Sequence, residues 1–149
     1  MAVDVSSEIE IARRRVDVAA YACDPDTATV WYRNIKSVEW RSEPPLAVGT
    51  RLAFVAEFLG RRLSYTYEVT EHIPGERFVM RTAEGPFPME TSYTLADADE
   101  GRTRMTLRNR GEPSGFAKLT APLVATAMRR ANRNDLRQLK RQLESQPAP

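Results

Sequence analysis

The chain is 149 residues long, which suits one domain with its own hydrophobic core and is short for two. Hydrophobic residues make up 42% of it and charged residues 28%, as in ordinary soluble globular proteins. No apolar run approaches the length of a bilayer-spanning helix, which argues against an integral membrane protein. The net charge of +2 is too small to indicate a nucleic acid as a partner. We therefore expect a single domain over residues 1–149.

The N-terminal segment and the cysteine content bear on the cellular compartment. The segment MAVDVSSEIEIARRR has acidic residues where a signal peptide has a basic and then an apolar stretch. Cys23 is the single cysteine and cannot form an internal disulfide, in agreement with a reducing environment. We predict a cytoplasmic protein with a flexible tail at about residues 145–149.

One strand and two short helices are predicted before residue 34. Apolar and polar residues alternate over Val3–Ile11, which is typical of a strand with one buried face. The period then changes, and residues 16–22 suit a short helix. Asp24 offers an N-cap, and Pro25 follows in the first turn of a second helix that should include Trp31. Cys23 and Asp24 are expected at the joint between the two helices.

The next seventy-five residues, up to about Asn109, predict six strands separated by glycine-containing turns. The strongest turn signal is Pro74-Gly75, because proline presets φ and glycine takes the left-handed position of a type II turn. The last three strands should be antiparallel neighbours. The residues that define the strands are Val38 and Trp40; Leu52, Phe54, Ala56 and Phe58; Leu63, Tyr65, Tyr67 and Val69; Phe78, Met80 and Thr82; Phe87, Met89, Thr91, Tyr93 and Leu95; and Thr103, Met105, Leu107 and Asn109.

The two faces of the predicted sheet differ in chemistry. The alternate positions, from Arg62 to Arg110, are mostly charged or hydroxylated, so one face should be exposed to water. By the same alternation Glu57 and Glu90 fall on that wet face, although a bulge near Pro86 and Pro88 would turn Glu90 inward. The other face is rich in aromatic and methionine residues, and a helix resting on it can enclose space as well as fill it.

A long amphipathic helix is predicted from about Ser114 to Glu144. Apolar residues recur there at spacings of three and four, as an apolar helical stripe requires. Ser114 is a plausible N-cap, and Pro122 predicts a kink or a change from a short helix to a longer one. At about 1.5 Å per residue such a helix needs an extended surface to cover its stripe, which indicates the sheet.

This order of elements resembles the helix-grip fold of the START-like, or SRPBCC, superfamily. Three stretches are similar to its bacterial polyketide cyclase/dehydrase-like branch: Asp24-Pro25-Asp26 before Trp31, the run from Tyr67 to Phe78, and Gly85-Pro86-Phe87-Pro88-Met89-Glu90. The resemblance implies an α+β fold in which a curved antiparallel sheet of about seven strands wraps around a long C-terminal helix. It also implies a hydrophobic cavity for a lipid, polyketide, steroid or other apolar molecule, and some relatives are aromatase/cyclases.

Several kinds of chemistry find no support in the residues. His72 is the only histidine, it lies at a strand end, and no G-x-S-x-G pattern accompanies it. One histidine and one cysteine far apart cannot supply the usual zinc ligands, though an oxygen-only site stays open. The glycines are dispersed over turns, which excludes a phosphate-binding loop. We predict no catalytic residue, metal or cofactor, and interpret Cys23 as a buried apolar residue.

The candidate ligand-binding residues share an inward position in this fold. Tyrosines there can offer a hydroxyl to a ligand carbonyl, methionines adapt to variable content, and a buried Asn109 needs a hydrogen-bond partner, for which a ligand or a trapped water is one option. Core packing is the alternative for each. The full set is Trp31, Phe54, Tyr65, Tyr67, Met80, Met89, Thr91, Tyr93, Asn109, Leu123 and Met128.

Three classes of function are compatible with these features. The first is a module that binds or transports a hydrophobic small molecule such as a lipid or polyketide. The second is an aromatase/cyclase-type enzyme that uses cavity tyrosines or a carboxyl for proton transfer, and the third is a structural protein with a filled core. The basic outer face of the long helix, from Arg129 to Arg141, is either solvated or approaches anionic lipid headgroups or an acidic carrier. A homodimer is compatible with all three.

Overall fold

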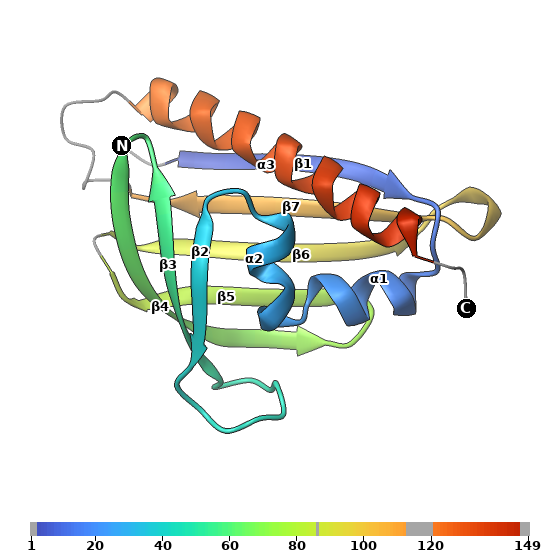
Figure 1. Cartoon of the computed structure of the whole chain (residues 1–149), viewed down its shortest axis with the longest axis horizontal. Coiled ribbons are helices and arrows are strands. Elements are labelled where there is room, and N and C mark those ends of the chain that lie inside the picture. The colour runs from blue at the N-terminus through green and yellow to red at the C-terminus, as the bar shows by residue number, and fades with distance from the viewer. Residues whose placement is uncertain (1–2, 86, 113–120, 147–149) are drawn as a thin grey trace.

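The computed structural model describes residues 3–85, 87–112 and 121–146 (Figure 1). It contains a seven-stranded antiparallel sheet, a long C-terminal helix and short helices after the first strand. The elements are β1 (Val3–Ile11), α1 (Arg15–Ala22), α2 (Ala28–Trp31), β2 (Ile35–Trp40), β3 (Arg51–Phe58), β4 (Arg61–Ile73), β5 (Arg77–Glu84), β6 (Met89–Asp97), β7 (Thr103–Gly111) and α3 (Ala121–Ser145).

The strands follow the order β1-β7-β6-β5-β4-β3-β2, so every neighbouring pair except β1 and β7 is consecutive in the chain. The pairing β6·β7 is regular from Met89↔Gly111 to Asp97↔Thr103. Register shifts occur instead in β2·β3 and twice in β4·β5. Because bulges increase local twist and bend a strand, they give this half of the sheet additional curvature.

The short helices begin where the sequence predicted, but the second is shorter than expected. The Asp24 carboxylate accepts a hydrogen bond from the Asp26 backbone N–H at 3.0 Å, which confirms the N-cap. A 3₁₀ turn at Pro25–Thr27 leads into the single turn of α2. The predicted Pro74-Gly75 turn is also present, with Gly75 at φ +79°.

Helix α3 lies across one face of the sheet, with α1 and α2 on the same face (Figure 1). Pro122 is in the first turn of the described helix, where a missing N–H costs nothing. The predicted N-cap Ser114 and the apolar residues Phe116 and Leu119 lie outside the described residues. At the other end, α3 continues to Ser145, and residues 147–149 of the expected tail also lie outside them.

Two hydrophobic clusters occupy the space between α3 and the sheet. The larger joins α1, α2 and the C-terminal half of α3 to the sheet around fully buried Ile11, Met105 and Leu139. The smaller cluster lies around Val5 and Val124, near the start of α3. The partly buried Tyr67 packs against both clusters.

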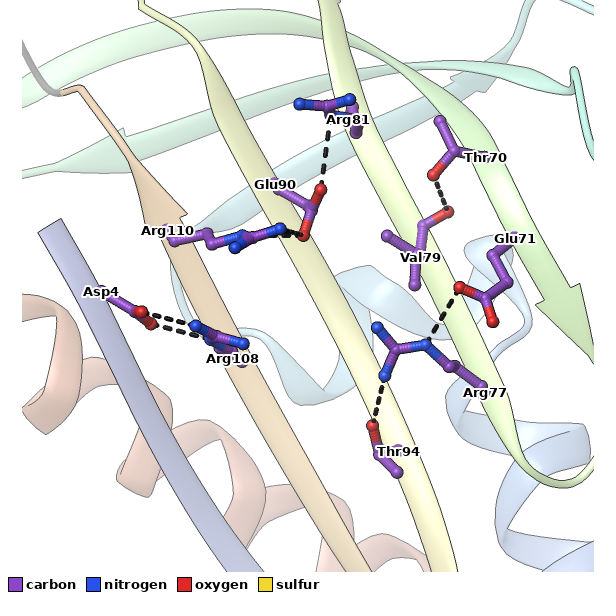
Figure 2. A network of polar contacts seen from close by, with 10 residues as sticks. All are labelled: Asp4, Thr70, Glu71, Arg77, Val79, Arg81, Glu90, Thr94, Arg108 and Arg110. Carbon is purple, nitrogen blue, oxygen red and sulfur yellow. Dashed lines mark hydrogen bonds and ion pairs between the residues drawn. The ribbon is translucent and has the colours of Figure 1, made fainter. Parts of the chain in front are cut away.

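The opposite face of the sheet carries a charged network whose residues all come from strands (Figure 2). Glu90 accepts a hydrogen bond from Arg110 at 2.9 Å and forms an ion pair with Arg81 at 3.3 Å. Asp4 accepts a hydrogen bond from Arg108 Nε at 2.8 Å, and this contact lowers the pKa of the Asp4 carboxyl. The predicted wet face is therefore confirmed, and Glu90 faces outward as simple alternation required.

Candidate ligand-binding cavity

A cavity of about 150 Å³ lies between the inner face of the sheet and the helices α2 and α3. Strands β3 to β7 form its floor, and the segment around Cys23 closes one side. Its principal lining residues are Cys23, Ala28, Tyr32, Leu52, Phe54, Ala56, Leu63, Tyr65, Tyr67, Phe78, Met80, Phe87, Met89, Thr91, Tyr93, Asn109, Met128, Ala131, Asn132 and Asp135. A dry cavity of roughly this volume holds one aromatic ring.

Aromatic rings form most of the apolar wall. Tyr65 and Tyr67 occupy alternate positions of β4, so both rings project to the same face, with centroids 5.7 Å apart. Tyr67 meets Phe54 edge-on at 5.6 Å, and Tyr65 meets Phe87 edge-on at 5.8 Å. Edge-to-face packing at these distances stabilises the positions of the rings in the wall.

The hollow follows from the curvature of the sheet and from small residues opposite it. Ala28 of α2, Ala56 of β3 and Ala131 of α3 all line the cavity with a single methyl group. The register shifts in β2–β5 bend the strands around this volume. Larger side chains at these three positions would fill the space.

A chain of side-chain hydrogen bonds crosses the cavity wall from α3 to β6. The Asn132 amide donates to Asn109 Oδ1 at 2.8 Å, and the Asn109 amide donates to Thr91 Oγ1 at 2.7 Å. Thr91 also hydrogen-bonds Tyr67, whose pKa is raised to about 12 by burial. The sequence predicts that a buried Asn109 needs a partner, and it finds two within the protein.

A second polar contact joins the α2 side of the cavity to the sheet. The hydroxyls of Tyr32 and Tyr93 are 2.7 Å apart and share one hydrogen bond. Burial raises the pKa of both phenols, and their proximity raises that of Tyr32 further. Both are therefore neutral at physiological pH, so one hydroxyl hydrogen of the pair is free to donate elsewhere.

Asp135 is the one ionisable group among the described residues of α3 that lines the cavity. Its residue is 3% exposed, and its Oδ1 accepts a hydrogen bond from the Arg33 backbone N–H at 3.0 Å. Burial raises the pKa of the carboxyl to about 6, while the N–H bond and the charge of Arg33 oppose the shift. Near neutral pH the cavity thus contains a group that can take up or release a proton.

Sequence reasoning missed Asp135, Asn132 and Tyr32. A signal was available for the first two, because they follow Met128 by seven and four positions and therefore share its helical face. Polar residues on a long helix are ordinarily exposed, and this preference hides the signal. Tyr32 gave no comparable signal, since its position depends on how the chain leaves α2.

Nine of the eleven predicted ligand-binding residues line the cavity, and Trp31 and Leu123 do not. Trp31 is 1% exposed and packs against the rings of Tyr32 and Tyr93, so it supports the wall from behind. Leu123 is 59% exposed near the start of α3, where its direction on the helix takes it away from the sheet. The nine lining residues are Phe54, Tyr65, Tyr67, Met80, Met89, Thr91, Tyr93, Asn109 and Met128.

The remaining candidates for chemistry lie as follows. Burial raises the pKa of the Cys23 thiol to about 12, so it is an inert lining group. His72 is half-buried rather than fully exposed, because a bulge after Val69 turns its ring onto Phe78. Within residues 3–85, 87–112 and 121–146, no group of three or more acidic, histidine or cysteine residues could hold a metal ion.

Comparison with known proteins gives the family. Residues 2–144 match the family described as "Polyketide cyclase / dehydrase and lipid transport". The chain belongs to this family. No curated protein matches the sequence. In the described part of the family member, no helix combines the length and the apolar character needed to cross a bilayer.

Solved structures share the fold of this family member at low sequence identity. A START superfamily protein from Mycobacterium smegmatis superimposes with a TM-score of 0.81 at 15% identity, covering 95% of this chain and 97% of the other. The Zhui aromatase/cyclase from a Streptomyces species gives 0.78 at 16% identity, covering 97% and 94%. Ginseng major latex-like protein 151 from Panax ginseng gives 0.74 at 13% identity, covering 95% and 97%. The fold is therefore START-like, as the sequence indicated.

Proposed function

We propose that this protein binds a small, largely apolar molecule in the cavity beneath the middle of α3. The observation that carries the proposal is the cavity itself, whose wall is mostly aromatic and aliphatic. Its polar groups are Asp24, Asn34 and Asp135, the hydrogen-bonded chain from Asn132 to Thr91, and the Tyr32–Tyr93 pair. Burial of a ligand's apolar area would supply about 25 cal/mol per Å². The few polar groups would set its orientation.

The volume of the cavity limits the ligand. About 150 Å³ takes roughly one ring with a short substituent, so a long acyl or polyketide chain needs the wall to open. Delivery of a lipid, which the family description includes, would therefore require that α2 or the β2–β3 edge moves away from α3. We infer a preference for compact ligands.

Ligand extraction and a cavity-filling variant test this proposal. Native mass spectrometry of the protein and of the variant Ala131→Phe should show a bound small molecule, or uptake from a panel of single-ring compounds, in the wild type only. The matched control is Ala20→Phe, because Ala20 is exposed on α1 and does not line the cavity, so this variant should bind as the wild type does. Equal uptake by both variants, or none by the wild type, would contradict binding in this cavity.

A second candidate function is proton-transfer catalysis of the aromatase/cyclase type. It is favoured by Asp135, because an acid/base group with a pKa of about 6 inside an apolar cavity matches what such a reaction needs. The Asp135 carboxylate would remove a proton from a carbon between two carbonyls of the substrate chain. The resulting enolate would attack a further carbonyl carbon of the same chain, whose oxygen becomes negative. Tyr93 could donate to the oxygen that becomes negative.

Turnover of a short poly-β-keto substrate separates the two functions. If the protein is an enzyme, Asp135→Asn should abolish cyclisation while the substrate still binds. Tyr93→Phe should lower the rate less than Asp135→Asn does, and Tyr65→Phe and Tyr67→Phe give the corresponding test of the other cavity phenols. Binding without any turnover above the buffer rate would leave the binding function alone.

A further inference from the structure

The charged residues that line the cavity have one sign. Asp24 and Asp135 are both present, whereas lysine, arginine and histidine are absent from the described lining residues. A carboxylate placed in such a cavity would be desolvated without a cationic partner and would face acidic groups. The lining therefore opposes anionic ligands such as free carboxylic acids at neutral pH.

Among the amides and carboxylates that line the cavity, the hydrogen-bonding capacity that is left is that of an acceptor, and the Tyr32–Tyr93 pair adds one hydroxyl donor. The amides of Asn109 and Asn132 already donate within the wall, and Asp24 accepts from the Asp26 N–H. In the described part of the chain, Asp135 receives a single hydrogen bond, on Oδ1, which leaves Oδ2 without a donor. A ligand that donates to Oδ2 would form a charge-assisted hydrogen bond, which is stronger than a hydrogen bond between neutral groups.

The surroundings of Asp135 support a donor-bearing or cationic head. The charged neighbour that acts on the carboxyl is Arg33, which is exposed and follows α2. The neutral phenols of Tyr32, which follows α2, and of Tyr93 in β6 are close enough to interact electrostatically with the carboxyl. Asp135 also borders a surface groove that Arg33, Arg137 and Arg141 line, and none of these three arginines lines the cavity. Aromatic faces also attract a cation.

We propose that the ligand presents an N–H or O–H donor to Asp135, so that the cavity selects single-ring amines and alcohols and rejects carboxylates of the same shape. This inference rests on the proposed binding function and adds the chemistry of the ligand's polar end. It assigns Asp135 as the specificity-determining residue of the site.

Three probes of matched size test the selection. The dissociation constants of 2-phenylethylamine, 2-phenylethanol and phenylacetate are measured by calorimetry on the wild-type protein at pH 7.5. The amine should bind most tightly and the carboxylate least, with a difference on the order of tenfold to hundredfold, as one hydrogen bond to a charged group provides. Equal affinity for the amine and the carboxylate would overturn the inference and leave the binding function intact.

The pH dependence supplies a second readout that needs no variant. Between pH 7.5 and 5 the Asp135 carboxyl takes up a proton and becomes a donor, because its pKa is about 6. Affinity for the amine should therefore fall, affinity for phenylacetate should rise, and affinity for the alcohol should change least. Parallel changes for the amine and the carboxylate would overturn the assignment to Asp135.

The variant Asp135→Asn should remove the discrimination, because its amide supplies a donor without charge. The amine should lose about tenfold in affinity and phenylacetate should gain, at both pH values. Asp99→Asn is the control, since Asp99 is exposed and lies outside the cavity. If none of the three probes binds the wild type at millimolar concentration, the proposed function fails for ligands of this size and the inference fails with it.

Discussion

The middle and the C-terminal part of α3 lie over the same sheet but differ in what they pack against. From Leu136 onward the apolar residues Leu136, Leu139 and Leu143 are buried in the larger cluster, and Leu139 is completely buried. Between Met128 and Asp135 the same helix lines the cavity and carries two polar residues on its inner face. Val124 is buried again at the N-terminal side. The helix is thus held at both ends and spans a hollow.

The difference shows how a fold can be stable and still carry a site. Packing at the two ends of α3 fixes the distance between the helix and the sheet. The middle of the helix therefore does not have to bury apolar residues to hold the two together. Polar residues such as Asn132 and Asp135, which would be costly in a solid core, can be kept where a hollow gives access to a ligand or to water. Ligand chemistry can then vary without loss of the fold.

Truncation of one side chain in each region should give the largest contrast. Leu139→Ala leaves a new cavity in the packed part and should lower the free energy of unfolding by about 2 to 5 kcal/mol. Met128→Ala enlarges a hollow that already exists beside a half-buried side chain, and should cost about 1 kcal/mol. Urea denaturation of both variants measures the difference. Equal losses would mean that the middle of α3 holds the fold as firmly as its end.

The sequence predicted the fold well because its signals are local and periodic. The alternation in β4 placed Tyr65 and Tyr67 inward, and the spacing of apolar residues in α3 placed Leu136 and Leu139. The contents of the cavity were harder to predict, since Asp135 lies inward through tertiary geometry against its ordinary preference for water. Trp31 and Leu123 were predicted near the cavity but do not line it. Periodicity predicts which face of an element a residue is on, and it does not predict the distance of that residue from the cavity.

Stability should depend on pH through Asp135, in the middle region. Its pKa is near the ordinary value of 3.8 when unfolded and about 6 when folded, so its contribution is fully present below pH 3.8 and is lost as the pH rises through 6. From pH 7.5 to 5 the free energy of unfolding should therefore rise by roughly 1 to 1.5 kcal/mol relative to Asp135→Asn. The pKa values of Asp4 and Glu144 are lowered in the folded protein. Their contribution to the free energy of unfolding is therefore lost only at pH values more acidic than this range.

Urea titrations of the wild type and Asp135→Asn across this pH range provide the measurement. The comparison between the two proteins cancels the contribution of other titrating groups. If the difference in the free energy of unfolding between the two proteins stays constant from pH 7.5 to 5, the Asp135 carboxyl is already solvated in the folded protein. The cavity region would then not differ from the packed part of α3 in its dependence on pH.

The smallest effects should separate the two faces of β6, where adjacent residues point in opposite directions. Thr91 faces the cavity and accepts from Asn109, whereas Glu90 faces outward between Arg81 and Arg110 (Figure 2). Thr91→Val leaves the Asn109 amide without its acceptor and should cost about 1 kcal/mol, because water can enter the hollow and limit the loss. Glu90→Gln removes surface ion pairs and should cost less than about 1 kcal/mol.

Ligand affinity distinguishes these neighbours more sharply than stability does. Thr91→Val should change the affinity of the single-ring probes, because it alters the wall of the cavity next to Tyr67. Glu90→Gln should leave it unchanged at any salt concentration, while its small effect on stability should shrink further at high salt. An affinity that responds to Glu90→Gln would mean that the charged network sets the shape of the cavity through the strands, and that the hollow is not insulated from the outer face.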